Sequence, residues 1–207
     1  MATFTSKPAG NLLRAKSVAI IGASQKGAWP QGIYRNLKNA KFAGGIYLIN
    51  PNYQELYGDK CYPNLAALPE VPDELLVLIP TRAVLGVLEE AAKLGTRSAT
   101  IYTAGFGEGD DEKGKERAQA MRDLCDKTGM VICGPNCMGI LNPPGRVTTY
   151  KQTIMNPAPI AGNVGIVSQS GSVVIAMLSD LRRFGISLSV SAGNEAVTRT
   201  VDYIEWL

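Results

Sequence analysis

The chain has 207 residues, enough for one sizeable domain or for one domain and part of another. Its 45% hydrophobic and 19% charged residues are typical of a globular protein, and a net charge of +3 is too small to indicate nucleic acid or an anionic membrane as a partner. No apolar run approaches the roughly 20 residues of a membrane span, and the chain start lacks a secretory signal, so the cytoplasm is the expected location.

The first part of the chain alternates between apolar runs and helical patterns. Short β-branched runs predict strands over 17–22, 44–50, 74–80, 98–105 and 130–134. The spacing of apolar residues predicts a helix from about Pro30, a helix after Pro80 that ends before Gly95, and a charged helix over 110–128, with a short helical turn near 64–72. Strands separated by such helices form right-handed βαβ units, so we expect a parallel, Rossmann-like sheet.

A second α/β unit follows. The pattern predicts a first domain over residues 1–145, a linker rich in proline over 146–161, and a second domain from 162 onward. Strands are expected over 163–168 and 186–192, with helices over 171–184 and from about Val197. These elements are too few to close a doubly wound sheet, so we expect an incomplete flavodoxin-like domain and a chain that is the front part of a longer protein.

The residues after each strand indicate where a ligand binds, because parallel sheets bind ligands beyond the carboxyl ends of their strands. These tips read "GASQKGAWPQG", "NPN", "PTR", "TAGFGEG" and "GPNCMG". They offer backbone N–H groups and small polar side chains but almost no acid that could serve as a base. This composition favours the binding of a polyanionic ligand over the breaking of bonds.

Several common alternatives do not fit the sequence. The chain contains no histidine, which excludes Ser-His-Asp and Cys-His catalysis as well as histidine-bound metals. Of its cysteines only Cys133 and Cys137 are close in sequence, so neither zinc nor a disulfide framework is expected. The dinucleotide fingerprint would need glycine where Ser24 stands, and an acid where the second strand ends in Asn50-Pro51-Asn52.

Five motifs, in this order and spacing, carry a resemblance to a known family: "SVAIIGAS", "YLINPN", "TAGFGE", "GPNCMGILNP" and "GNVGIVSQSGSV". They resemble the CoA-binding α portion of the NDP-forming acyl-CoA synthetases, the superfamily of succinyl-CoA synthetase and ADP-forming acetyl-CoA synthetase. The resemblance covers the chain from about Arg14 to Leu207. It implies a ligase reaction in which acid, CoA and nucleoside triphosphate give acyl-CoA, diphosphate and phosphate through an acyl phosphate and a phosphohistidine.

The resemblance also implies a set of CoA-binding residues at the strand ends: Gly22, Ala23, Ser24, Asn50, Pro51, Asn52, Ile79, Pro80, Arg82, Thr103, Ala104, Gly105, Asn136 and Cys137. Many family members carry a lysine shortly after the second-strand proline, whereas this chain has Asn52 and Tyr53. The phosphates of CoA would then need another cation, for which Arg82 and Lys26 are candidates or else ordinary surface cations. Cys137 is open to two interpretations, a reactive thiol near the thiol of CoA or a small buried side chain.

Ser170, Gly171 and Ser172 follow a predicted strand and open a predicted helix. A serine at this place is often a plain helix cap. The free N–H groups of a helix start also favour anions, and the resemblance implies that this helix start holds phosphate or the phosphohistidine.

Two functions from different classes remain. In the first, the chain is the CoA-binding portion of an ADP-forming acyl-CoA synthetase whose histidine and ATP-grasp domain, with ATP and Mg, lie outside this chain, so the chain alone is inactive. In the second, it is a non-catalytic module that senses CoA or acyl-CoA. Both predict coenzyme A as a partner. The first adds a carboxylic acid and the missing ligase domains, and the apolar last helix leaves open a homodimer.

Overall fold

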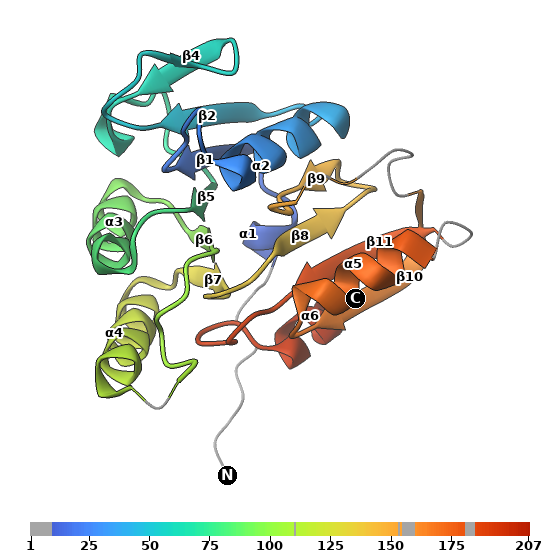
Figure 1. The fold of residues 1–207 in the computed structure, drawn as a ribbon. Helices are drawn as coiled ribbons and strands as arrows, with labels where there is room; N and C mark the ends of the chain where they lie inside the picture. The colour runs from blue at the N-terminus through green and yellow to red at the C-terminus, as the bar shows by residue number, and fades with distance from the viewer. Residues whose placement is uncertain (1–9, 110, 153, 155–159, 181–184) are drawn as a thin grey trace.

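The computed structural model describes residues 10–109, 111–152, 154, 160–180 and 185–207 (Figure 1). Its larger sheet has seven strands in the order β3-β4-β2-β1-β5-β6-β7. The strands β1 (Ser17–Ile21), β2 (Gly45–Ile49), β5 (Glu74–Val77), β6 (Ser98–Ile101) and β7 (Val131–Cys133) are parallel, each within a predicted strand. The sequence did not predict β3 (Glu55–Leu56) and β4 (Asp59–Tyr62), a short antiparallel pair at the β2 edge.

The two faces of this sheet bury alternate residues of each strand. Ala19 and Ile21 of β1 pack in one core with helices α3 (Thr81–Leu94) and α4 (Glu112–Thr128). Val18 and Ile20 pack in the other core with α1 (Gly10–Leu13), α2 (Ala28–Asn39) and residues of the second sheet. Figure 1 shows α3 and α4 on one side of the central strands and α1 and α2 on the other. A sheet buried on both faces explains why its strands are largely apolar.

The helix ends follow local chemistry. Gly95 adopts a left-handed conformation with φ of 104° and ends α3, as the sequence predicted. Asp111 caps α4 by accepting a hydrogen bond from the N–H of Gly114. The helical turn expected near 64–72 is a short 3₁₀ helix, η1 (Leu65–Ala67), and α2 begins two residues earlier than predicted, at Ala28.

The second sheet has the order β10-β11-β8-β9. The predicted strands β10 (Ala161–Ser168) and β11 (Ile186–Ser191) pair in parallel, and the hairpin β8 (Gly139–Asn142) and β9 (Val147–Thr148), which the sequence did not predict, joins β11 antiparallel. β9 therefore lies within the stretch predicted as a linker. Helices α5 (Gly171–Asp180) and α6 (Thr200–Trp206) accompany this sheet, and the predicted helical residues 181–184 lie outside the described part.

The two sheets share one core. Leu188 and Val190 of β11 and Tyr203 of α6 lie in the same cluster of buried side chains as Val18 and Cys133 of the first sheet. Hydrogen bonds reinforce this packing: the side chain of Asn36 in α2 donates to the carbonyl of Tyr150, and that of Asn142 donates to the carbonyl of Leu13. In the part of the chain that the structure describes, no helix is long and apolar enough to cross a bilayer.

Candidate functional site

A cleft of about 560 Å³ opens at the carboxyl ends of β1, β2 and β5. The chain leaves β1 toward β2 on one side and later returns to β5 on the other, so this is the point where the strand order reverses. The sequence predicted six of the residues that line it: Gly22, Asn50, Pro51, Asn52, Ile79 and Pro80. The one charged side chain among the lining residues that the structure describes belongs to Glu90.

Gly22 is required by the backbone at the base of this cleft. Its φ is +89°, and a Cβ built there would lie 2.5 Å from the carbonyl oxygen of Leu78. Its N–H donates to the carbonyl of Ile49, so this residue touches both neighbouring strand ends. Any side chain at position 22 would push β1 and β5 apart where the ligand is expected.

The side chain of Asn50 joins two of the predicted tips. Its amide nitrogen donates to the carbonyl of Ala23 at 2.7 Å, and its amide oxygen accepts from the N–H of Asn52 at 2.9 Å. Tyr57, which sequence reasoning missed, anchors the same loop by donating its hydroxyl proton to the carbonyl of Ser24 at 2.8 Å. Asn50 thus shapes the cleft through its own hydrogen bonds.

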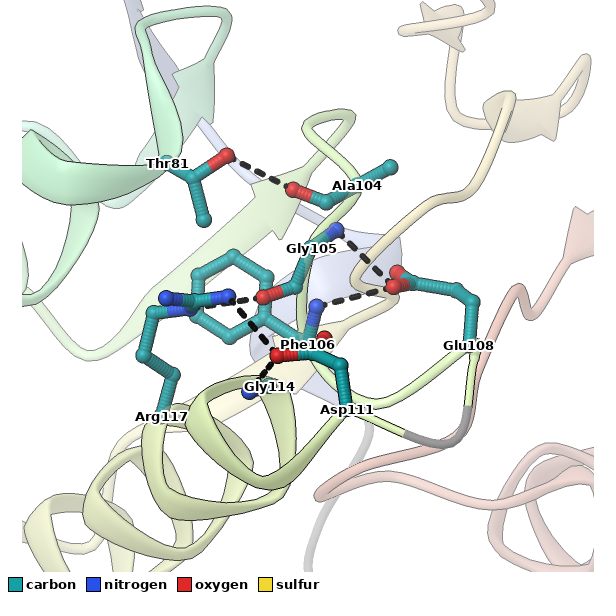
Figure 2. Close-up of polar contacts among 8 residues, drawn as sticks. All are labelled: Thr81, Ala104, Gly105, Phe106, Glu108, Asp111, Gly114 and Arg117. Atoms are coloured by element: carbon teal, nitrogen blue, oxygen red, sulfur yellow. Dashed lines mark hydrogen bonds and ion pairs between the residues drawn. The ribbon is translucent and has the colours of Figure 1, made fainter.

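The tip after β6 is tied to its neighbour by two threonines. The hydroxyl of Thr103 donates to the carbonyl of Ile79 at 2.8 Å. The hydroxyl of Thr81 donates to the carbonyl of Ala104, also at 2.8 Å (Figure 2). Gly105 has a φ of +99°, and a Cβ there would lie 2.9 Å from the Thr81 side chain. These contacts fix the backbone of the predicted tip, including Thr103, Ala104 and Gly105.

A carboxylate already occupies two of the backbone donors at this tip. Glu108 accepts hydrogen bonds from the N–H groups of Gly105 and Phe106, both at 2.9 Å, as Figure 2 shows. The side chain of Asn194 also donates to it, at 2.6 Å. Although partial burial raises the pKa of Glu108, these hydrogen bonds lower it more, and the net pKa falls below the ordinary value. Glu108 lies within the quoted tip "TAGFGEG", but its bonding to the N–H groups of that tip was missed, and Asn194 was missed because it lies far away in the chain.

The tip after β7 is connected to the same network. Asn136, in a left-handed conformation with φ of 56°, donates its N–H to the carbonyl of Thr103 and its side-chain amide to Asn194. Cys137 is 1% exposed, and its thiol donates to the carbonyl of Ile101 at 3.4 Å. This environment fits the interpretation of Cys137 as a buried packing residue.

The loop that opens α5 lies beside the β7 tip. The N–H of Gly193 donates to the carbonyl of Gln169, and the N–H of the next residue, Asn194, donates to the carbonyl of Pro135. Gly171 is required here, because a Cβ would lie 1.8 Å from the side chain of Met138. Within the described residues, the hydroxyls of Ser170 and Ser172 accept no hydrogen bond from a backbone N–H, so neither serves as a helix cap.

The two candidate cations, Arg82 and Lys26, stand apart from the cleft. Both are exposed, neither is among the lining residues, and neither forms an ion pair with another described residue. The four cysteines are buried and free, and no group of three or more metal-ligating side chains occurs in the described ranges.

The fold and the site together define an α/β protein whose cleft sits at the switch point of a parallel sheet and, apart from Glu90, is lined by uncharged residues. The chain belongs to the family described as CoA binding domain, whose model matches residues 16–143. Residues 161–207 match a second model, described as succinyl-CoA ligase like flavodoxin domain. The resemblance to the NDP-forming acyl-CoA synthetases and the predicted fold class are both confirmed.

Individual relatives agree with this assignment. The chain is 40% identical over 209 residues to trans-feruloyl-CoA synthase FCS1 of an unidentified prokaryote, covering 99% of this chain and 29% of the relative. It is 38% identical to the ADP-forming acetate–CoA ligase of Methanocaldococcus jannaschii, covering 92% of this chain and 26% of the relative. The chain therefore spans less than a third of these curated relatives.

A solved structure shares the fold. The dinucleotide forming acetyl-coenzyme A synthetase 1 of Ca. Korarchaeum cryptofilum, solved in complex with phosphate and ADP, superposes with a TM-score of 0.84 at 32% identity. The match covers 96% of this chain and 42% of that one.

Proposed function

We propose that this chain is the CoA-binding portion of an ADP-forming acyl-CoA synthetase, a ligase that joins a carboxylic acid to CoA while ATP is converted to ADP and phosphate. The observation that carries the proposal is the cleft at the switch point of a sheet that belongs to the CoA-binding family, whose lining is uncharged apart from Glu90. Backbone N–H groups at such strand ends suit a pyrophosphate.

The proposed binding residues are the strand tips that the sequence singled out. Gly22, Asn50, Pro51, Asn52, Ile79 and Pro80 line the cleft, and Ala23 and Ser24 belong to the loop that Asn50 and Tyr57 anchor. The tips with Thr103, Ala104, Gly105, Asn136 and Cys137 continue the same edge of the sheet toward α5. Arg82, at the start of α3, does not line the cleft and would contact CoA only from outside it. Ser170, Gly171 and Ser172 would then cradle the phosphate or the phosphohistidine at the start of α5, where the N–H groups of a helix start favour an anion.

The acyl phosphate and phosphohistidine steps need groups that this chain lacks. It contains no histidine, so a phosphoryl carrier of that kind would lie elsewhere in the complete protein, together with the sites for ATP and Mg. We therefore expect the 207-residue chain to bind CoA and to form no acyl-CoA by itself. Acyl-CoA formation by the isolated chain would contradict this part of the proposal.

A parallel thermal-shift series with CoA, NAD and ATP tests the proposal. At a CoA concentration near 100 times its dissociation constant, binding adds about 2.7 kcal/mol to the free energy of unfolding. For a chain of this size, that corresponds to an increase of about 5 to 10 °C in melting temperature. Stabilisation by NAD without stabilisation by CoA would overturn the proposal.

The alternative is a non-catalytic module that senses CoA or acyl-CoA, which the absence of histidine favours. The coding sequence after Leu207 separates the two: an in-frame histidine segment and an ATP-grasp domain support the ligase, and a stop codon supports the module. We also propose a division into residues 1–145, 146–161 and 162–207, and a cytoplasmic location, where free buried cysteines such as those observed persist.

A further inference from the structure

Lys151 is a buried lysine outside the predicted site. It follows the β8–β9 hairpin, where its N–H donates to the carbonyl of Met138 and continues the antiparallel ladder. The residue is 8% exposed, and burial lowers the pKa of its ammonium group, an effect that the neighbouring Cys137 thiol partly offsets. A lysine is rarely buried to this extent unless an anion pairs with it.

Three lysines of this chain lie over aromatic rings, and their surroundings differ. Lys38 lies 5.1 Å from the centre of the Tyr34 ring and also forms an ion pair with Asp59 at 2.9 Å. Lys60 lies 4.7 Å from the centre of the Tyr62 ring and is exposed to water.

Lys151 differs from both of these lysines. It lies 4.1 Å from the centre of the Trp29 ring, and no described residue gives it a carboxylate or a hydrogen-bond acceptor. An aromatic ring compensates only part of the lost hydration of an ammonium group. Of these three lysines, Lys151 is thus the one that is buried and has no counter-ion within the described chain.

The ammonium group remains accessible to a ligand. Two other unpaired polar atoms, Oε2 of Glu74 and the hydroxyl oxygen of Tyr203, are completely buried. The nitrogen of Lys151 has no hydrogen-bond partner among the described residues either, but it is not one of these completely buried atoms. Its platform, Trp29, is 52% exposed. The ammonium nitrogen therefore keeps some exposed surface beside the Trp29 ring, through which a small anionic group can reach it.

Lys151 is connected to both of the regions proposed to bind phosphate, through Trp29 to the one and through Tyr150 to the other. Trp29 is in the first turn of α2, the helix that begins directly after the loop with Gly22 and Ser24. On the other side, the hydroxyl of Tyr150, next to Lys151 in the chain, donates to the carbonyl of Gly171 at the start of α5 at 2.6 Å.

We propose that Lys151, held over Trp29, binds a phosphate oxygen of the ligand at this junction and supplies the cation that the β2 tip lacks. The phosphate comes either from the pyrophosphate of CoA or from a separate phosphoryl group at α5. This inference rests on the proposed function, because it requires a phosphate-bearing ligand at these tips.

The test is isothermal titration calorimetry on the full chain, with CoA, pantetheine and orthophosphate as separate probes. Lys151→Met removes the charge and keeps most of the side-chain volume, Lys151→Arg keeps the charge, and Lys60→Met is the matched control on an exposed ring. We expect Lys151→Met to weaken CoA binding by about 10- to 100-fold, the range for a lost hydrogen bond to a charged group. Lys151→Arg and Lys60→Met stay within about threefold of the wild type, and pantetheine binding is unchanged.

Each outcome of the titrations decides between explanations. If the wild type fails to bind CoA, the proposed function fails, whereas equal CoA and orthophosphate affinities in wild type and Lys151→Met overturn the inference about Lys151 alone. A loss for CoA only assigns the pyrophosphate, and a loss for orthophosphate only assigns a separate phosphoryl group. An equal loss for pantetheine, or a lower melting temperature of ligand-free Lys151→Met, would show that the lysine is structural and overturn the inference.

Discussion

The two halves of the proposed binding edge are built in different ways. At β1, β2 and β5, the tips form an open cleft whose shape depends on backbone approach at Gly22 and on the amide of Asn50. At β6 and β7, side chains already bind the tips, since Glu108 and Asn194 occupy the donors that a ligand would use. The first half thus offers an open cleft, whereas in the second half the backbone donors are already hydrogen-bonded in the absence of a ligand.

Because of this difference, we expect substitutions in the two halves to lower stability by different amounts. A tip shaped by backbone contact tolerates no added atoms, because neither partner can move without shifting a strand. Where exposed polar side chains hold a tip, removing one side chain costs only the small net free energy of its few hydrogen bonds. The largest effects of substitution are therefore expected at the cleft.

Gly22→Ala is the change with the largest expected effect. The left-handed conformation at this position and the 2.5 Å approach to Leu78 O together lower the free energy of unfolding by about 4 kcal/mol. Urea denaturation measures this loss, and the CoA thermal shift should disappear. Gly58→Ala is the matched control: its φ is +87° but nothing lies within 4 Å of the added Cβ, so it loses only the conformational part, about 1 kcal/mol. Equal losses in both variants would refute the role of backbone approach.

Asn50→Ala is expected to have an intermediate effect. It removes the hydrogen bonds to Ala23 O and from Asn52 N, which costs about 2 kcal/mol of stability and frees the loop beside the cleft. CoA affinity, measured by calorimetry, should fall about tenfold. The corresponding change in the other half, Asn194→Ala, should cost about 1 kcal/mol and alter CoA affinity less. The reverse ranking would show that the network, and not the cleft, controls binding.

Glu108→Gln is expected to have the smallest effect at neutral pH, about 1 kcal/mol, because the side chain is exposed and solvent screens its interactions. Its pH dependence has a defined sign. The folded-state pKa of Glu108 lies below the ordinary 4.5, so its contribution is fully present above that pH and is lost as the pH falls through the folded-state pKa.

Urea unfolding of Glu108→Gln and the wild type between pH 3 and pH 7 measures this dependence. The two proteins should differ at pH 7 and converge at the acidic end. Glu112→Gln, which changes a glutamate paired only with Lys115 on the surface of α4, should show no such convergence. If the difference in stability between Glu108→Gln and the wild type persisted at the acidic end, the ionised Glu108 carboxylate would not be the group that stabilises this tip through its hydrogen bonds.

Much of the fold could be predicted because it depends on local pattern. Burial on both faces made most of β1 and β5 apolar, and Gly95 marked a helix end through its own conformation. The hairpin of β8 and β9 was missed because β8, "GILN", pairs with β11 some fifty residues later, and β9, "VT", is only two residues long. Nothing local distinguishes such a strand from a loop.

The candidate site divides in the same way. Gly22, Asn50 and Pro80 were accessible from sequence since a ligand site at strand ends follows from the parallel sheet itself. Asn194 and Lys151 were not, because each acts on an element far away in the chain, and Glu108 was not, because its bonds to the nearby N–H groups of Gly105 and Phe106 depend on how the tip folds. Their side chains look like ordinary surface residues until the partner is known.

The sequence by itself determined the sheet, the family and the edge where the ligand is proposed to bind, because apolar periodicity and glycine-rich strand ends are local and carry their own physical constraints. Only the tertiary structure decided which polar groups are already satisfied and which remain free. That distinction depends on burial and on contacts between residues more than a hundred positions apart, such as Asn36 with Tyr150, and no local pattern records it.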